Sequence, residues 1–378
     1  MHHMLLLGAG KIGTAIARFL AHTGDYDVLV GDVDERALRR LERIPNIRAT
    51  RIDSSNPTDL ANAMKGRQIV ISALNYALNA TVAQTALQAG LSYFDLTEEV
   101  ETTRVVKDVA KQARLGQIFM PQCGLAPGFV SIAAHHLTRD FDKLDEVELR
   151  VGALPQFPTN EMKYNLTWST DGLINEYGNP CECIHDGKLI EVLPLEGLEH
   201  FSLDGVDYEA FNTSGGVGTL AETLDGQCRM LNYKTVRYRG HRDLMVFLMN
   251  ELRLNDRRDI LKDILENAVP VTPQDVVLIF CTITGWKDGL LTQVTDARKI
   301  YAGAFMGERC SAIQITTAAG MCAVVDLHAS GKLPTQGFVK QEQVRLDDFL
   351  ANRFGAAYDV QMRPLMKTAT PVPAPARV

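Results

Sequence analysis

The first third of the chain alternates short apolar runs with stretches whose apolar residues recur at helical spacing. An apolar run of about four to eight residues is typical of a buried strand, and helical spacing is typical of a helix packed on a sheet. Regular alternation of the two predicts a parallel sheet with helices on both faces. About six strands are expected, at LLLG, DVLVGD, NIRATRID, QIVISAL, SYFDL and QIFMP.

The middle of the chain has a different pattern, with longer strands in which polar and apolar positions alternate. Asp186-Gly187 and Asp288-Gly289 are typical two-residue hairpin turns. Helical spacing returns only at 242–252 and 257–266. This part therefore predicts an α+β domain with a largely antiparallel sheet.

These patterns divide the chain into two domains. We expect a doubly wound α/β domain of the Rossmann type at 1–122 and the α+β domain at 123–309. A helix of small residues begins near Cys310, so 310–360 is expected to return and complete the first domain. The stretch 367–378 is rich in Pro and Ala and is expected to be disordered.

The composition of the chain mainly excludes certain classes of partner. The chain has 378 residues and a net charge of -7, which argues against nucleic acid or an anionic membrane as a partner. Seven cysteines and no signal-peptide pattern favour reduced thiols in a cytoplasm. Cys181 and Cys183 share one strand face without a second Cys or His pair at zinc spacing, so no metal is expected. The expected partner is a small molecule.

A glycine pattern after the first strand gives the first domain a function. Gly8-Ala-Gly10-Lys11-Ile12-Gly13 directly follows that strand and opens the first helix, as a dinucleotide-binding turn requires. Gly8 permits the tight turn, Gly10 lets backbone N–H groups approach a pyrophosphate, and Gly13 allows close packing of helix and strand. Asp32 ends the second strand, where a carboxylate accepts the ribose hydroxyls and repels a 2′-phosphate. The predicted cofactor is NAD rather than NADP.

Other strand ends should border the same cofactor. Asp53 follows the third strand and either binds the adenine amine or caps the next helix. The ends of the fourth, fifth and sixth strands lie on the nicotinamide edge, at Ala73, Leu74, Asn75, Tyr76, Leu96 and Cys123. Tyr76 and Cys123 should also contact the substrate there. His135 and His136 are adjacent on a helix some turns beyond Cys123, so a Cys/His nucleophile is not expected.

Further motifs lie beyond the nucleotide domain, at Cys123 to Gly128, Val151 to Pro155, Lys163-Tyr164, Trp168-Ser169, Phe211 to Leu224 and Asn232 to His241. These segments resemble the saccharopine dehydrogenase family, with most similarity to its L-lysine 6-dehydrogenase branch. The chain departs from the saccharopine reductases at Ala126, where their G-L-D-P-G turn carries an acid. The resemblance implies NAD-dependent oxidation of the side-chain amine of L-lysine. The product would be 2-aminoadipate 6-semialdehyde, which cyclises to a piperideine carboxylate, with ammonia released.

Such a reaction requires a neutral amine, because hydride leaves a carbon beside nitrogen only when the nitrogen lone pair is free. A lysine-type amine has a pKa of about 10.4, so either a desolvated pocket lowers it or a base accepts the proton. Asp171 and His241 are the candidates for this base. Each has a structural alternative of equal weight, a helix cap for Asp171 and a cap or an acid partner for His241.

Substrate recognition points to other residues of the second domain. Arg237 is the candidate fork for a substrate carboxylate, and Lys163 is a weaker one. Trp168, followed by Ser169, offers a flat wall for a methylene chain, although a core tryptophan fits the same pattern. A pocket between the domains would gather these residues around the nicotinamide.

Two other functions remain open. One is a reductase of the same family that joins an aldehyde and an amine, as saccharopine and carboxynorspermidine enzymes do. The other is an NAD-binding sensor that has lost catalysis. The resemblance also implies a homodimer or a larger homo-oligomer.

Overall fold

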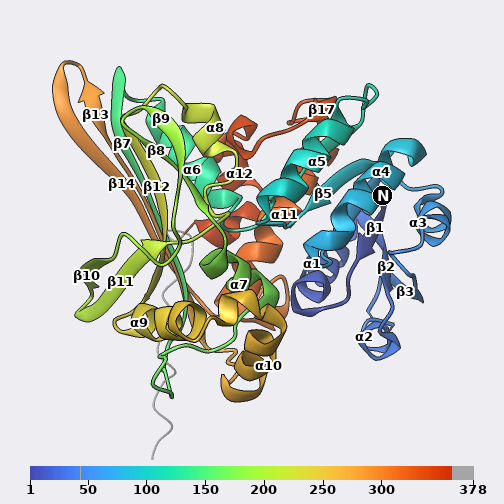
Figure 1. Ribbon diagram of the computed structural model, residues 1–378. Helices are drawn as coiled ribbons and strands as arrows, with labels where there is room; N and C mark the ends of the chain where they lie inside the picture. Colours follow the sequence, from blue (N-terminus) through green and yellow to red (C-terminus); the bar gives the residue numbers. More distant parts are fainter. Residues whose placement is uncertain (43, 360–378) are drawn as a thin grey trace, which may run out of the picture.

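The computed structural model describes residues 1–42 and 44–359, and its two large sheets stand side by side with helices between them (Figure 1). The first sheet is parallel throughout, in the order β17-β6-β5-β4-β1-β2-β3. Its strands are β1 (His2–Leu7), β2 (Tyr26–Asp32), β3 (Ile47–Arg51), β4 (Ile69–Ser72), β5 (Ser92–Asp95), β6 (Ile118–Met120) and β17 (Gly337–Phe338). All residues of β4, β5 and β6 are buried, because helices cover both faces of the sheet.

The helices of this half follow the expected alternation. Asn56 caps α3 and Glu99 caps α5, each by accepting bonds from backbone N–H groups. By contrast, α1 begins at Gly10 without a side-chain cap. The helices are α1 (Lys11–His22), α2 (Glu35–Arg39), α3 (Pro57–Met64), α4 (Asn79–Ala89) and α5 (Val100–Ala110), with a 3-10 turn η1 (Tyr76–Leu78).

The C-terminal part of the described chain runs back to the first sheet. Helix α11 (Ala312–Ala329) packs on α1 and lies between β5 and β13 (Asp275–Lys287). Its N-terminus is capped by Ser311 and by the carboxylate of Asp275. This helix is long and apolar enough to span a membrane, but 78% of it is buried inside the protein. β17 then pairs with β6, followed by η4 (Gln341–Gln343), α12 (Leu346–Ala351) and η5 (Gly355–Tyr358).

The second sheet has the order β10-β11-β12-β7-β13-β14, and among these pairs only β12 and β7 run parallel. Asp186-Gly187 and Asp288-Gly289 join β8 to β9 and β13 to β14, so both predicted hairpins are confirmed. The strands are β7 (Lys143–Pro155), β8 (Cys181–His185), β9 (Lys188–Val192), β10 (Glu199–Leu203), β11 (Val206–Asn212), β12 (Met230–Tyr238), β13 and β14 (Leu290–Tyr301).

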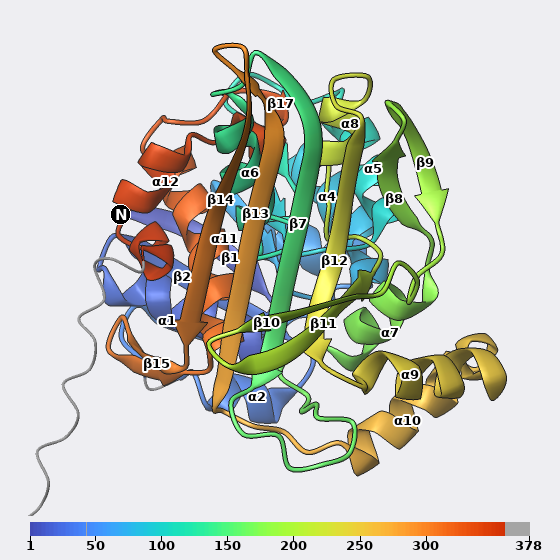
Figure 2. The same ribbon diagram turned by 90° about the vertical axis from the view of Figure 1, so that its left-hand side faces the viewer.

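Among the described residues, helices cover only one face of this second sheet. Figure 2 shows the other face, on which β7, β13 and β14 lie open and the β10–β11 hairpin crosses one end. Behind the sheet lie α6 (Phe129–Thr138) and α8 (Leu220–Leu224), and beside its lower end lie α7 (Thr170–Gly178), α9 (His241–Val246), the π-helical turn η2 (Phe247–Glu251), η3 (Leu254–Asp256) and α10 (Arg258–Ala268). A short hairpin, β15 (Gly303–Phe305) and β16 (Glu308–Cys310), precedes α11.

This architecture confirms the predicted fold class, a doubly wound parallel sheet with a second α+β part whose sheet is largely antiparallel. The strand order 3-2-1-4-5-6 within the first sheet reverses between β1 and β4, so the carboxyl ends of these strands form the crevice in which such sheets bind ligands. Residues 367–378, for which the sequence predicts disorder, lie outside the described residues.

Candidate active site between the two sheets

The glycine turn between β1 and α1 is packed tightly on one side and open on the other. Gly8 has a φ of 101°, and a Cβ atom there would lie 2.5 Å from the carbonyl oxygen of Ala73. A Cβ on Gly13 would lie 2.0 Å from the Gly8 carbonyl oxygen, whereas a Cβ on Gly10 would meet no other described residue within 4 Å apart from its chain neighbours. The uncapped N-terminus of α1 therefore faces open space, as a bound pyrophosphate requires.

Asp32 lies at the end of β2 beside this turn. Its carboxylate accepts hydrogen bonds from the backbone N–H groups of Ala9, at 2.6 Å, and Asp34, at 2.9 Å. The side chain is only partly buried, so the carboxylate remains accessible. This position fits a ribose of a dinucleotide bound across the turn.

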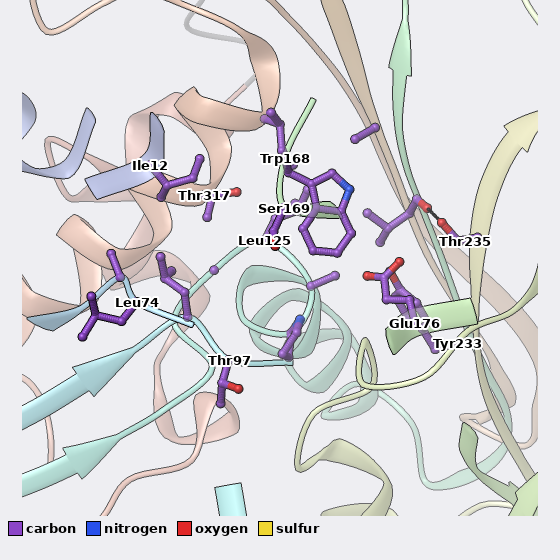
Figure 3. A pocket seen from close by; sticks show the side chains of 18 of the residues that line it. Ile12, Leu74, Thr97, Leu125, Trp168, Ser169, Glu176, Tyr233, Thr235 and Thr317 are labelled. Atoms are coloured by element: carbon purple, nitrogen blue, oxygen red, sulfur yellow. Dashed lines mark hydrogen bonds between the residues drawn. The ribbon is translucent and has the colours of Figure 1, made fainter. Parts of the chain in front are cut away.

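A cavity leads from this edge of the first sheet to the second sheet. Ile12, Ala73 and Leu74 line its first-sheet end, and Glu176, Tyr233, Thr235 and Arg237 line its second-sheet end. Between them lie Leu96, Thr97, Gly124, Leu125, Ala126, Pro127, Val151, Ala153, Trp168, Ser169, Ile313 and Thr317. Figure 3 shows Leu125 and Trp168 in the middle of this path and Glu176 beyond them. Glu176 and Arg237 are the only carboxylate and the only guanidinium group among the described residues that line it.

Helix α7 supplies one wall of the cavity. Ser169 caps the helix, with its hydroxyl oxygen accepting the N–H of Gly172 at 3.2 Å. Gly172 leaves room for the indole of Trp168, because a Cβ there would lie 2.3 Å from the ring. Glu176 follows one helical turn later on the same face. Trp168 and Glu176 therefore belong to a single wall.

Arg237 near the end of β12 is fixed by its neighbours. Its side chain is buried, with Nε donating to the Tyr177 hydroxyl oxygen at 2.7 Å and Nη1 donating to the Val236 carbonyl oxygen at 2.9 Å. The guanidinium carbon lies 5.1 Å from the centre of the Tyr164 ring. These contacts hold a permanent positive charge at the second-sheet end of the cavity.

His241 lies behind Arg237 instead of in the cavity. Its Nδ1 lies 2.9 Å from the carbonyl oxygen of Met162 and its Nε2 lies 3.1 Å from the Tyr177 hydroxyl. A carbonyl can only accept, so Nδ1 carries the proton and Nε2 accepts from Tyr177, whose oxygen accepts from Arg237. Burial, with the positive charge of Arg237, lowers the pKa of His241 to about 3 and keeps the ring neutral.

Models of two protein families match the chain. The saccharopine dehydrogenase NADP binding domain matches residues 4–117, and the saccharopine dehydrogenase C-terminal domain matches residues 124–354. The chain belongs to the saccharopine dehydrogenase family. This confirms the resemblance to the family, though not to its L-lysine 6-dehydrogenase branch, and it makes the first domain a pyridine-nucleotide-binding domain. NAD and NADP are not distinguished by this match.

Relatives in this family are distant. The saccharopine dehydrogenase (NADP(+), L-glutamate-forming) of Schizosaccharomyces pombe is 24% identical over 202 residues, covering 51% of this chain and 44% of that protein. The mitochondrial alpha-aminoadipic semialdehyde synthase of Bos taurus is 21% identical over 306 residues, covering 75% and 31%. The match therefore spans less than half the length of either relative. The apo structure of saccharopine dehydrogenase (L-Glu forming) from Saccharomyces cerevisiae has a TM-score of 0.75 at 16% identity, covers 94% of this chain and 96% of its own, and shows the shared fold.

Several residues that the sequence predicts for the site do not line the cavity in this protein. The Asp171 carboxylate pairs with Lys262 at 2.7 Å and faces a shallow outer groove, and the Lys163 amine donates to the Arg239 carbonyl oxygen at 3.0 Å. Both are held at the surface by these partners. Neither Asp171 nor His241 is placed to take a proton from a ligand in the cavity, which corrects the expectation for both.

Cys123 also departs from expectation. It is 1% exposed, and its thiol donates to the Met120 carbonyl oxygen at 3.0 Å and lies 3.4 Å from the Gln341 amide nitrogen. Burial raises the pKa of this thiol well above its usual value. The neighbouring Gly124 lines the cavity, so the strand end reaches the site while the thiol points into the core.

The remaining expected positions divide between the cavity and its surroundings. Ile12, Ala73, Leu74, Leu96, Trp168, Ser169 and Arg237 line the cavity. Asp53 accepts bonds from the N–H and hydroxyl of Ser55, at 3.0 and 2.6 Å, so it orders its own turn, and Asn75 does the same for Ala77 at 3.0 Å. Tyr76 is in η1 outside the cavity, and Lys11 lines the outer groove with Asp171. In the described part of the chain no cluster of three or more His, Cys, Asp or Glu could hold a metal ion.

Glu176 is the residue that the sequence interpretation missed. Burial raises its pKa to about 8, with Arg237 opposing the shift and Glu98 adding to it. Burial also raises the pKa of Glu98 to about 7. The signal was present in Leu173-Ile-Asn-Glu176-Tyr177, where a carboxyl interrupts an apolar stripe at helical spacing.

Proposed function

We propose that this protein is an NAD-dependent dehydrogenase that oxidises the side-chain amine of L-lysine. The product is 2-aminoadipate 6-semialdehyde, which cyclises to a piperideine carboxylate. Loss of a hydride from the carbon that carries the amine gives an iminium ion, and addition of water then releases ammonia and the aldehyde. The bound nicotinamide ring supplies the hydride acceptor.

The observation that carries this proposal is the cavity, which is apolar along most of its length and carries a fixed guanidinium at one end. Arg237 suits a substrate carboxylate, and Trp168 gives a methylene chain a flat wall. The glycine turn and the uncapped α1 fit a dinucleotide at the other end. An amino acid anchored at Arg237 would extend its side chain toward the first-sheet end.

Deprotonation of the substrate amine follows from the character of that first-sheet end. Ile12, Ala73 and Leu74 line it, and the described residues there include no carboxylate. An apolar environment disfavours an ammonium ion and lowers its pKa from about 10.4. The rate of oxidation should therefore rise with pH toward the lowered pKa of the substrate amine, as a profile of kcat/KM against pH would show.

NAD is the cofactor that Asp32 favours, because a carboxylate at the end of β2 repels a 2′-phosphate. Replacing it, Asp32→Ser, should shift the ratio of kcat/KM values toward NADP by about tenfold or more. Asp34→Ser, two residues further along the chain, is the matched control. An unchanged ratio in Asp32→Ser would contradict the role of Asp32 at the ribose.

The activity is tested by NADH formation with a panel of L-lysine, L-ornithine, diamines and saccharopine. Turnover of L-lysine above the other amines supports the proposal, and silence on every member contradicts it. A second candidate is a reductase that joins an aldehyde and an amine, which the names of the relatives favour. That function would instead show as NADH or NADPH oxidation that requires both partners.

A further inference from the structure

Glu176 is a buried carboxyl group that has no bonding partner among the described residues around it. It is 6% exposed, and within the described residues its carboxylate forms no hydrogen bond or ion pair. Figure 3 shows the group turned toward the middle of the cavity, with Trp168 on the facing side. A buried carboxyl without a partner is costly, so its retention calls for a ligand that completes it.

Arg237 stands on β12 at the same end of the cavity. Its positive charge acts on Glu176, yet no hydrogen bond or ion pair within 4.0 Å joins the two groups in the described structure. Two of its nitrogens are engaged by Tyr177 and Val236, which leaves Nη2 without a protein acceptor among the described residues. An acidic and a basic side chain that share an end of a cavity without bonding to one another leave room for a ligand between them.

We propose that Glu176 and Arg237 together form a receptor for the head group of an α-amino acid. The carboxylate of the ligand pairs with Arg237, and its α-ammonium group pairs with Glu176. The two charges of such a head group branch from one carbon, so one small ligand completes both side chains. This inference rests on the proposed function and adds its selectivity, since a diamine lacks the carboxylate and an ω-amino acid carries its ammonium group far from the carbon next to the carboxylate.

Ionisation of Glu176 depends on the groups around it. Arg237 favours the charged form, and Glu98 disfavours it from the loop after β5. Tyr164, Tyr177, Tyr233 and Cys181 also interact with its charge. An ammonium ligand favours the carboxylate, so binding of an amino acid should weaken as the pH falls below the pKa of about 8 and Glu176 becomes protonated.

The test uses L-norleucine, which has the head group and chain of lysine without the reactive amine, and hexanoate, which lacks the α-ammonium group. Calorimetry of the full chain with NAD, just above the pKa of about 8, should show norleucine binding about tenfold or more tighter than hexanoate. Glu176→Gln should remove most of this difference, with hexanoate unchanged or slightly tighter. Glu176→Asp keeps the charge and should restore part of it, and Glu251→Gln on exposed η2 is the matched control.

Three outcomes overturn the receptor. Equal affinities for norleucine and hexanoate in the native protein would do so, as would an unchanged difference in Glu176→Gln. A Glu176→Gln protein that binds norleucine normally but no longer oxidises lysine would also do so. Glu176 would then act in proton transfer instead of in binding the head group. Norleucine binding without any lysine oxidation would leave the receptor standing and remove only the proposed function.

Discussion

The two ends of the cavity are built in different ways. At the first-sheet end the backbone forms the site, because Gly8, Gly10 and Gly13 stand within one short turn. At the second-sheet end side chains form it, with Glu176 from α7 and Arg237 from β12 brought together only by folding. One end is encoded within one short segment, while the other depends on contacts between distant segments.

This difference has a physical cause. A pyrophosphate needs N–H groups at a helix start, which any sequence with the right glycines provides. A substrate needs charges at chosen points, and each buried charge needs support from further residues. Here Met162, His241 and Tyr177 support Arg237 through one chain of hydrogen bonds. The second end is thus the part in which members of one fold can differ in substrate.

The largest effect is expected where the second end loses its charge. Arg237→Met should lower kcat/KM for L-lysine by about a hundredfold to a thousandfold, since the substrate carboxylate then faces Glu176 alone. The dissociation constant for NAD should stay within about twofold of the native value, because the glycine turn is untouched. Arg309→Met, at an exposed arginine, is the control for losing a positive charge. A loss of NAD affinity in Arg237→Met as large as the loss of kcat/KM would show that the two ends do not act independently.

A smaller effect, confined to the first end, is expected from Gly10→Ala. Apart from its chain neighbours, the added Cβ meets no atom of the described residues within 4 Å, and the φ of -70° suits alanine, so the melting temperature should not change. The methyl group would occupy the space over α1, and NAD binding should weaken about tenfold. Gly303→Ala, whose Cβ would have its nearest neighbour at 4.0 Å, is the control. Unchanged NAD affinity in Gly10→Ala would contradict the position of the pyrophosphate.

The same contrast explains what the sequence could predict. The alternation of apolar runs, the glycine turn and the two Asp-Gly hairpins are local features, and the fold class drawn from them is confirmed. Arg237, Trp168 and Ser169 were named from family motifs, and they line the cavity. The homo-oligomeric state and the cytoplasmic location stay predictions.

The direction and burial of individual side chains could not be predicted from such local features. Asp171 and His241 have suitable chemistry, but a lysine from α10 holds one at the surface and the core encloses the other. Both outcomes depend on segments far apart in the chain, which no local pattern reports. Glu176 was missed for a different reason: it interrupts an apolar stripe of its own helix, but a carboxyl on a helix is more often exposed than buried.

A moderate effect is expected from the support of Arg237. Tyr177→Phe removes the hydroxyl that accepts from Arg237 and contacts His241, so the guanidinium loses its fixed orientation. KM for L-lysine should rise about fivefold to tenfold while kcat changes little, because binding rather than chemistry is affected. Tyr208→Phe, at a buried tyrosine in β11, is the control. A fall in kcat at constant KM would place Tyr177 in the chemical step instead.

The smallest effect is expected at Cys123, which lies between the two ends without facing either. Its thiol points to Met120 and Gln341, so Cys123→Ala removes core contacts and leaves the cavity lining intact. Turnover of L-lysine and NAD affinity should both stay within about twofold of the native values, although the free energy of unfolding should fall by about 1 kcal/mol. Steady-state rates and a denaturant titration measure the two quantities. Complete loss of turnover in a folded Cys123→Ala protein would mean that the thiol reaches the substrate. The two ends of the cavity would then not be independent of the segment after β6, which lies between them.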